Sequence, residues 1–213
     1  MLKYLVKQPA IQNQQNKALL MLHGFGSNEA DLFTMAPYFP DDLWIFSAQA
    51  PHALDYGGYA WYPIYIDAQN QKISDGQQAF ESVLKLSKFI DFLKDKYQIS
   101  SENFNLLGFS QGAILSYSIA LNYPEKIKNI IALSGYIYED IMPVNEDISK
   151  YERLNFFVSH GIYDDIIPIE LARKIPPYLD ERHIQYTYKE YPMGHEVNQD
   201  CLKNMIAWVN ENL

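Results

Sequence analysis

The chain has 213 residues, of which 48% are hydrophobic, and this is enough for one domain with a substantial core. Its formal net charge of −9 argues against nucleic acid or an anionic membrane surface as the main partner. The one cysteine, Cys201, excludes an internal disulfide framework and indicates a reducing compartment, while no apolar run is long enough for a signal peptide or a transmembrane helix. We therefore expect one cytoplasmic domain over residues 1–213, with no transmembrane segment and no nucleic-acid partner.

The N-terminal part predicts an edge strand followed by a buried strand. Residues 2–6 alternate weakly between apolar and polar side chains, as in a strand at the edge of a sheet. Residues 18–22 are continuously apolar, which is typical of a strand covered on both faces. A glycine-rich loop, residues 23–28, follows this strand, and Ser27 or Asn28 can cap the next helix.

A long segment rich in aromatic residues follows the next strand. Residues 44–48 predict a short buried strand, and residues 51–70 predict an irregular stretch dense in aromatics, glycine and proline. Structureless stretches of this length usually line a site or form a lid. Ser74 and Gln77 resemble a capping box at the start of an amphipathic helix that runs to Tyr97.

The C-terminal half continues the alternation of strand and helix. Strands are predicted over residues 103–109, 130–135, 156–161 and 184–191, and helices over residues 111–122, over residues 169–174 and at the C-terminus. Pro176 and Pro177 are expected to break or kink the helix before them, and residues 136–152 are expected to be a surface excursion. This alternation favours an α/β fold with a mostly parallel central sheet and helices on both faces.

A Gly-x-Ser-x-Gly motif, Gly108-Phe109-Ser110-Gln111-Gly112, lies between a predicted strand and a predicted helix. Strand, sharp turn and helix are the order that a nucleophile elbow requires. A side chain at Gly108 or Gly112 would collide with the neighbouring backbone as the chain doubles back. The following helix directs free N–H groups to the place where negative charge would develop beside Ser110.

A possible acid and base for this serine lie further along the chain. A serine nucleophile needs a base near neutral pH, and a histidine base needs a carboxylate that fixes its tautomer. Asp164 and then His195 follow Ser110, each after a strand-like segment, in the order Ser…Asp…His that is typical of α/β-hydrolases. The ends of parallel strands would bring the three side chains to one edge of the sheet. Asp165 and Asp140 are alternative candidates for the acid.

The other histidines and the cysteine have simpler interpretations. His23 and His160 follow predicted buried strands, and we expect each to order its loop through hydrogen bonds. The histidines show no metal-ligand spacing, so we expect no metal site and no cofactor. Cys201 has no paired base in the sequence and is expected to be a small buried hydrophobe.

Taken together, these motifs resemble the phospholipase/carboxylesterase family of α/β-hydrolases, which includes the acyl-protein thioesterases. The matching segments are Leu22-His23-Gly24-Phe25-Gly26-Ser27, Gly108-Phe109-Ser110-Gln111-Gly112, His160-Gly161-Ile162-Tyr163-Asp164 with Ile167-Pro168, and Met193-Gly194-His195. The resemblance implies an α/β-hydrolase fold without a separate cap domain. It also favours Asp164 over Asp165 as the acid, and it implies an oxyanion hole made by the backbone N–H groups of Phe25 and Gln111.

Two positions indicate a branch within this family. The first loop reads Gly24-Phe25-Gly26-Ser27, and Ala113 follows Gly112 after the elbow. Eukaryotic acyl-protein thioesterases typically have Gly-Leu-Gly-Asp and Gly-Gly there. The chain is therefore more similar to the bacterial carboxylesterase branch, and the resemblance implies ester hydrolysis more strongly than protein depalmitoylation.

The sequence thus predicts a cofactor-independent carboxylesterase that acts on a small-molecule ester or acyl substrate. Ser110 would attack the acyl carbonyl, His195 would act as base and then as acid, and Asp164 would orient His195, with an acyl-enzyme intermediate. The segment Ala60-Trp61-Tyr62 resembles the family's substrate loop, so Tyr59, Trp61 and Tyr62 are candidate substrate-binding residues. The aromatic side chains of this loop either form an apolar acyl-chain wall near Ser110 or pack the loop onto the sheet; they are Tyr56, Tyr59, Trp61, Tyr62 and Tyr65.

Three further interpretations stay open at this point. Within the same chemistry, the substrate could be a thioester or a lysophospholipid, as for an acyl-protein thioesterase or a lysophospholipase. From another class, the chain could be a non-catalytic ligand-binding protein on a hydrolase scaffold, although such proteins usually lose a triad residue. Apolar residues in the 51–70 stretch suit a homodimer and a bound substrate equally well.

Overall fold

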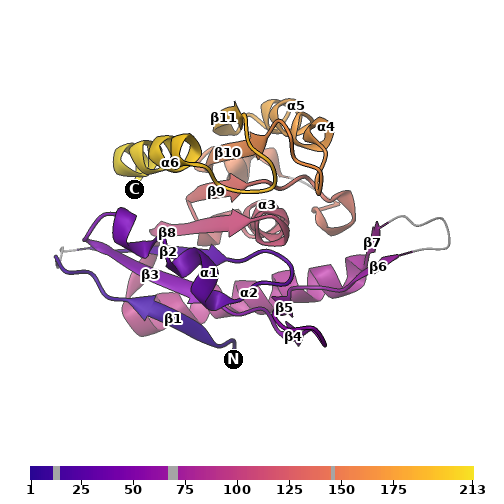
Figure 1. The fold of residues 1–213 in the computed structure, drawn as a ribbon. Helices are drawn as coiled ribbons and strands as arrows, with labels where there is room; N and C mark the ends of the chain where they lie inside the picture. The colour runs from indigo at the N-terminus through magenta and orange to yellow at the C-terminus, as the bar shows by residue number, and fades with distance from the viewer. Residues whose placement is uncertain (12–14, 67–71, 145–146) are drawn as a thin grey trace.

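The computed structural model describes residues 1–11, 15–66, 72–144 and 147–213, and its centre is a seven-stranded sheet (Figure 1). The strands are β1 (Tyr4–Lys7), β2 (Asn16–Leu22), β3 (Leu43–Ala48), β8 (Ile99–Phe109), β9 (Asn129–Leu133), β10 (Asn155–Gly161) and β11 (Gln185–Tyr191). They lie side by side in the order β1-β3-β2-β8-β9-β10-β11. Only the β1–β3 pair in this sheet is antiparallel, so the predicted mostly parallel sheet is confirmed.

Helices cover both faces of this sheet. They are α1 (Glu29–Phe33), α2 (Gly76–Tyr97), α3 (Gln111–Asn122), α4 (Ile169–Ala172), α5 (Ile175–Asp180) and α6 (Gln199–Asn212). Residues of α2, α3, α4 and α5 join one hydrophobic cluster, and residues of α1 and α6 join a second. In β2, Leu20 and Leu22 belong to the first cluster, whereas Leu19 and Met21 belong to the second. Because helices cover both faces of the sheet, side chains on both sides of this strand are buried, and its sequence is continuously apolar.

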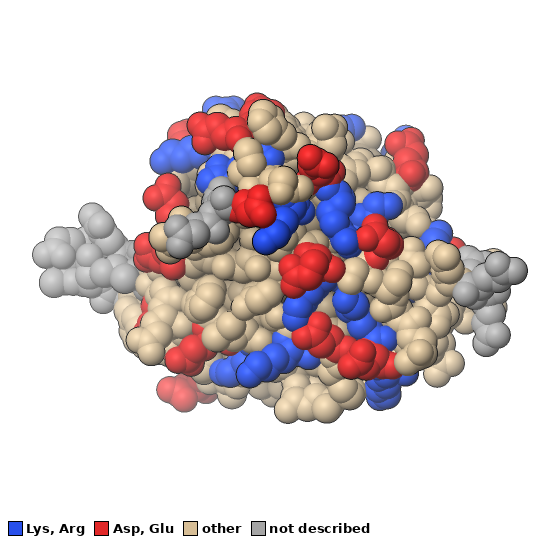
Figure 2. Space-filling view, turned by 180° about the vertical axis from the view of Figure 1, so that it is seen from behind, with Lys and Arg blue, Asp and Glu red and all other residues tan. Residues whose placement is uncertain are grey.

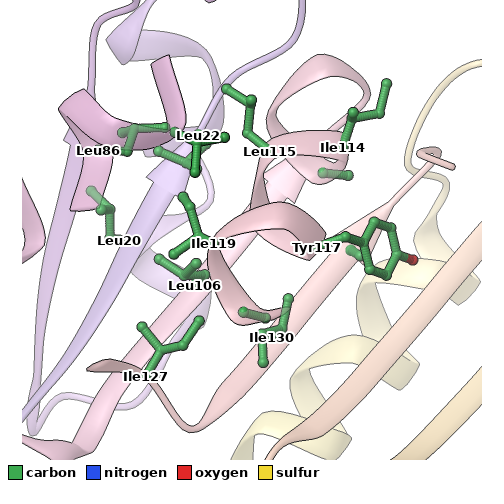
Figure 3. Packing of buried hydrophobic residues seen from close by; sticks show 14 of the residues in the cluster. Leu20, Leu22, Leu86, Leu106, Ile114, Leu115, Tyr117, Ile119, Ile127 and Ile130 are labelled. Carbon is green, nitrogen blue, oxygen red and sulfur yellow. The ribbon is translucent and has the colours of Figure 1, made fainter. Parts of the chain in front are cut away.

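The helix α3 lies at the centre of the larger cluster. Each of its residues from Gln111 to Leu121 is buried. Figure 3 shows Leu115 and Ile119 of α3 on the side that faces Leu22 of β2 and Leu106 of β8. Burial of each such side chain contributes about 1.5–3 kcal/mol to folding. The helix is therefore a fixed support for the residue that precedes it, Ser110.

The segment between β3 and α2 contains two small hairpins, so the prediction of an irregular stretch over 51–70 is wrong for the short paired strands within it. Residues 67–70 of that stretch lie outside the described residues. The paired strands are β4 (His52–Ala53) with β5 (Tyr59–Ala60), and β6 (Ile64–Ile66) with β7 (Lys72–Ser74). Strands of two or three residues are too short to produce a readable alternating pattern.

The structure also defines two helix boundaries more closely than the sequence did. Asp75 rather than Ser74 is the N-cap of α2, since its Oδ1 accepts the backbone N–H of Gln78 at 2.9 Å. The helix predicted over 169–174 ends before the two prolines, as α4 at Ala172, and Pro176 and Pro177 lie in the first turn of the next helix, α5. Proline is tolerated there because the first N–H groups of a helix have no intrahelical partner.

The expected surface excursion over residues 136–152 is partly buried. Ile141 and Tyr151 are 0% and 2% exposed, and the hydroxyl of Tyr151 donates to the carbonyl oxygen of Leu121 at 3.1 Å. These two side chains anchor the segment to the face that carries α3. Residues 145–146 of this segment lie outside the described residues.

Charged side chains of both signs intermingle on the face seen in Figure 2. Oppositely charged side chains also form ion pairs, such as Arg153 with Glu102 at 2.7 Å. Exposed pairs of this kind contribute only about 0–1 kcal/mol each. Among the described helices, none is both long and apolar enough to cross a membrane.

Candidate active site

Ser110 lies at the sharp turn between β8 and α3. Its backbone has φ 54° and ψ −116°, a conformation that residues other than glycine rarely adopt. A Cβ atom on Gly108 would lie 2.4 Å from the carbonyl group of Gly112, and one on Gly112 would lie 2.0 Å from the carbonyl oxygen of Leu22. Neither contact is possible for a real Cβ, so the elbow requires both glycines.

Ser110, His195 and Asp164 form a continuous chain of hydrogen bonds. Nε2 of His195 lies 2.9 Å from Oγ of Ser110, and Nδ1 of His195 lies 2.7 Å from Oδ2 of Asp164. Asp164 follows β10 and His195 follows β11, and these strands are parallel neighbours whose ends meet. A proton on Nδ1 that is donated to the carboxylate leaves Nε2 free to accept the serine proton.

Both carboxylate oxygens of Asp164 have hydrogen-bond partners. Its Oδ1 accepts the backbone N–H groups of Ile166 at 2.9 Å and of Ile167 at 2.8 Å, while Oδ2 faces His195. The side chain of Asp164 is fully buried, with an exposed fraction of 0%. The two alternative acids, Asp165 and Asp140, are exposed. The structure therefore brings Asp164, and neither alternative, against the histidine.

His160 also lies against Asp164. Its Nε2 donates to the carbonyl oxygen of Ile167 at 2.8 Å and lies 3.3 Å from Oδ2 of Asp164. Burial lowers the pKa of His160, so the ring is neutral. Its Nδ1 has no hydrogen-bond partner among the described residues. The ring orders the loop after β10, as expected, but it is not fully hydrogen-bonded.

His23 orders the loop after β2. Its Nδ1 lies 2.7 Å from the carbonyl oxygen of Gly24, and its Nε2 lies 3.1 Å from the backbone nitrogen of Ala50. Because Ala50 can only donate, Nε2 must accept, and Nδ1 must carry the proton. Burial lowers the pKa of His23, so it is a neutral structural residue at the base of the loop that carries Phe25.

The two candidate oxyanion donors come from two different elements. Gln111 is the first residue of α3, and the N–H groups of a first helical turn have no intrahelical acceptor. Phe25 lies in the loop after β2, next to Gly26, whose N–H donates to the carbonyl oxygen of Tyr59 at 2.9 Å. Phe25 and Gln111 line the same cavity as Ser110 and His195.

That cavity has a volume of about 660 Å³ and is largely apolar. Its described lining contains no Lys, Arg, Asp or Glu side chain. Apart from the residues already named, its wall includes Tyr56, Ile114, Tyr136, Ile166 and Leu171. Tyr56 was expected there as part of an apolar acyl-chain wall. The other four residues come from separate loops and helices and form no motif that the sequence could reveal.

The three aromatic candidates for substrate binding have different positions. Tyr62 lines the cavity. Trp61 is 0% exposed and is not among the described lining residues, and its indole Nε1 donates to the carbonyl oxygen of His23 at 2.9 Å. Tyr59 pairs through its backbone with Gly26 and Ser27, also outside the described lining. Among the aromatic residues expected to form an acyl-chain wall, Tyr56 and Tyr62 therefore line the cavity, and Trp61 and Tyr59 pack the loop onto the rest of the fold.

Neither a metal site nor a reactive cysteine is evident in the part of the chain that the structure describes. No group of three or more His, Cys, Asp or Glu side chains is arranged there to hold a metal ion. Cys201 is buried, its thiol lies 3.3 Å from Oγ of Ser159, and burial raises its pKa. A protonated thiol in this position is a packing element.

A model of the family described as Phospholipase/Carboxylesterase matches residues 6–213. A curated relative, a probable carboxylesterase SOBER1-like protein of Arabidopsis thaliana, is 27% identical, over 96% of this chain and 83% of the relative. A probable carboxylesterase of Oryza sativa subsp. japonica is 30% identical over 92% and 77% of the two chains. Acyl-protein thioesterase 1 of Kluyveromyces lactis is 27% identical over 92% and 91%.

Solved structures of esterases share this architecture. The carboxylesterase of Bacillus cereus superposes with a TM-score of 0.84 at 18% identity, over 100% of this chain and 95% of the other. The esterase PE8 superposes with a TM-score of 0.80 at 26% identity, over 100% and 99%. These similarities confirm the predicted α/β-hydrolase fold, and no separate cap domain is evident in the described parts of the chain.

Proposed function

Because the chain belongs to the phospholipase/carboxylesterase family, we propose that it is a serine hydrolase that cleaves carboxylic esters with Ser110, His195 and Asp164. The observation that carries the proposal is the hydrogen-bonded sequence of these side chains, with contacts of 2.9 Å from His195 to Ser110 and 2.7 Å from His195 to Asp164. The names of the relatives from Arabidopsis thaliana and Oryza sativa agree with this reaction class.

The reaction proceeds in two halves. Oγ of Ser110 attacks the acyl carbon while Nε2 of His195 takes its proton, and Asp164 stabilises the imidazolium that forms. The tetrahedral intermediate collapses, the bond to the leaving alkoxide breaks, and His195 returns the proton to that alkoxide. Water, deprotonated by His195, then attacks the acyl-enzyme and releases the carboxylic acid and Ser110.

The negative charge of each tetrahedral intermediate falls on the former carbonyl oxygen. The backbone N–H groups of Phe25 and Gln111 are the proposed donors to this oxygen. Such preorganised donors contribute on the order of 3 kcal/mol each to transition-state stabilisation. Since only backbone atoms act, the side chain of Phe25 is free to line the cavity.

The uncharged lining of the cavity favours an ester with an uncharged acyl group as the substrate. Its wall of tyrosine, isoleucine and leucine side chains offers apolar surface, whereas an anionic acyl group would lose its hydration without gaining a cationic partner. A thioester is the second candidate, because acyl-protein thioesterase 1 of Kluyveromyces lactis is a relative over 92% of the chain. The single-domain organisation over residues 1–213 and the cytoplasmic location stay predictions from the sequence.

The test is turnover of an activated short-chain aryl ester by Ser110→Ala. We expect turnover to fall by a factor on the order of 10⁴ or more, with an unchanged thermal unfolding curve. Ser134→Ala is the matched control, since Ser134 is also buried and its hydroxyl has no hydrogen-bond partner among the described residues. Full turnover by Ser110→Ala would contradict the proposal, and an inactive native protein would favour a ligand-binding scaffold.

A further inference from the structure

Trp61 connects three parts of the structure through three hydrogen bonds. Its backbone N–H donates to Oε1 of Gln111 at 2.8 Å, and its indole Nε1–H donates to the carbonyl oxygen of His23 at 2.9 Å. Its carbonyl oxygen accepts the hydroxyl of Ser82 in α2. Trp61 is completely buried, so water does not compete for any of these bonds.

The first connection immobilises the side chain of Gln111. The amide of Gln111 accepts from Trp61 through Oε1 and donates through Nε2 to the carbonyl oxygen of Tyr62 at 2.8 Å. Both ends of the amide are thus bound to two consecutive residues of one loop. The backbone N–H of Gln111 is one of the two proposed oxyanion donors, so this loop is attached directly to that donor's residue.

The second connection fixes the loop that carries the other donor. His23 is bound at its carbonyl oxygen by the indole of Trp61, and its ring is bound to Gly24 and Ala50. The rings of His23 and Trp61 also contact each other, with centroids 5.4 Å apart. Phe25 lies two residues after His23. The position of its backbone N–H therefore depends on the position of His23.

We infer that Trp61 is a positioning residue that holds the N–H donors of Phe25 and Gln111 at a fixed separation. The inference rests on the proposed function, because it concerns the oxyanion hole of that reaction. An oxyanion hole acts only when both donors are directed at the oxygen of the tetrahedral intermediate. Loss of one connection of Trp61 should therefore weaken binding of the transition state more than binding of the substrate.

The position of Trp61 separates this role from substrate recognition. Trp61 is absent from the described lining of the cavity, whereas its neighbour Tyr62 is part of it. Replacement of the indole of Trp61 by a phenyl ring removes its N–H and changes no residue of the described cavity wall. The expected signature is therefore a lower kcat at an almost constant KM.

The experiment compares Trp61→Phe with Trp44→Phe. Both variants keep an aromatic ring and lose one indole N–H, but Nε1 of Trp44 is buried without a hydrogen-bond partner among the described residues. For Trp61→Phe we expect kcat for an activated ester to fall roughly 10- to 100-fold. Affinity for a boronic acid, which binds serine as a tetrahedral adduct, should fall by a similar factor. Trp44→Phe should match the native protein in both measurements.

If Trp61→Phe does not fold, a second variant tests the positioning role of Trp61. Ser82→Ala removes the bond to the carbonyl oxygen of Trp61 without touching the cavity, and it should lower kcat in the same direction by a smaller factor. Native kcat and native boronic acid affinity in the folded variant would overturn the inference.

The outcomes also distinguish this inference from the proposed function. If Ser110→Ala abolishes turnover while Trp61→Phe behaves as the native protein, the inference alone fails. If Ser110→Ala keeps full turnover, the proposed function and the inference fail together.

Discussion

Oδ2 of Asp164 lies 2.7 Å from Nδ1 of His195, and no part of the Asp164 side chain is exposed. The other carboxylate oxygen is occupied by two backbone N–H groups of the loop that follows. This arrangement fixes the carboxylate before it meets the histidine. The orientation of the imidazole toward Ser110 is therefore built into the loop after β10.

Replacement of Asp164 should consequently be far more damaging than replacement of the adjacent aspartate. In Asp164→Asn the carboxamide favours the wrong tautomer of His195, and we expect kcat for an activated ester to fall on the order of 10⁴-fold. Asp165→Asn, a change of the same size at an exposed neighbour, should stay within about twofold of the native value. Steady-state kinetics on both variants, with thermal unfolding as a check, measures the difference. A larger loss in Asp165→Asn would reverse the assignment of the acid.

The uncharged cavity should select uncharged acyl groups. A neutral butyrate ester should be hydrolysed with a higher kcat/KM than the hemisuccinate ester of the same alcohol, since the wall offers no cation to the free carboxylate. Ile166→Lys places an ammonium group at the wall. It should reduce the ratio of the two kcat/KM values roughly tenfold, which corresponds to about 1.4 kcal/mol of transition-state free energy.

A matched control for this test lies in the same loop. Ile162 is 41% exposed and Ile166 is 49% exposed, but only Ile166 belongs to the described lining of the cavity. Ile162→Lys therefore adds the same charge away from the wall and should leave the ratio of the two kcat/KM values unchanged. Equal shifts in both variants would show that net charge, and not the cavity wall, controls the selectivity.

Stability should decrease as the pH falls below about 6.5, the ordinary pKa of histidine. Burial lowers the pKa of His23 and of His160 in the folded state, so the unfolded chain binds more protons than the folded chain in this range. The free energy of unfolding is therefore highest above that pH and declines below it, by at most about 1.4 kcal/mol per pH unit for each histidine.

Urea unfolding between pH 7.5 and pH 5.5 can measure this slope. In His23→Asn the slope should be shallower than in the native protein, whatever the stability of the variant at pH 7.5. His183→Asn changes an exposed histidine whose φ of 56° suits asparagine, and it should leave the slope unchanged. A native slope in His23→Asn would show that this residue does not contribute to the acid sensitivity.

Much of the fold and the proximity of the three proposed catalytic side chains could be predicted from sequence because each depends on local patterns. Ser110, Asp164 and His195 each follow a strand, and parallel strands end at the same edge of a sheet. The glycines around Ser110 were informative for a similar reason, since the close approach they allow is a property of one short segment.

The roles of neighbouring aromatic residues could not be predicted in this way. Trp61 and Tyr62 are adjacent and equally aromatic, yet only Tyr62 reaches the cavity. The difference arises from the Gln111 amide and the His23 carbonyl group, which are distant in sequence and meet Trp61 only in the folded chain. A similar ambiguity affected the cap of α2, where Ser74 and Asp75 are both good capping residues and only the backbone geometry selects Asp75.

Covalent labelling by a fluorophosphonate tests the nucleophilic role of Ser110 most directly, because this reagent forms a stable adduct with an activated serine. Intact-mass measurement should show one adduct per chain, peptide mapping should place it on Ser110, and Ser110→Ala should remain unlabelled. The absence of an adduct on the folded native protein, or an adduct on another residue, would contradict a nucleophilic Ser110.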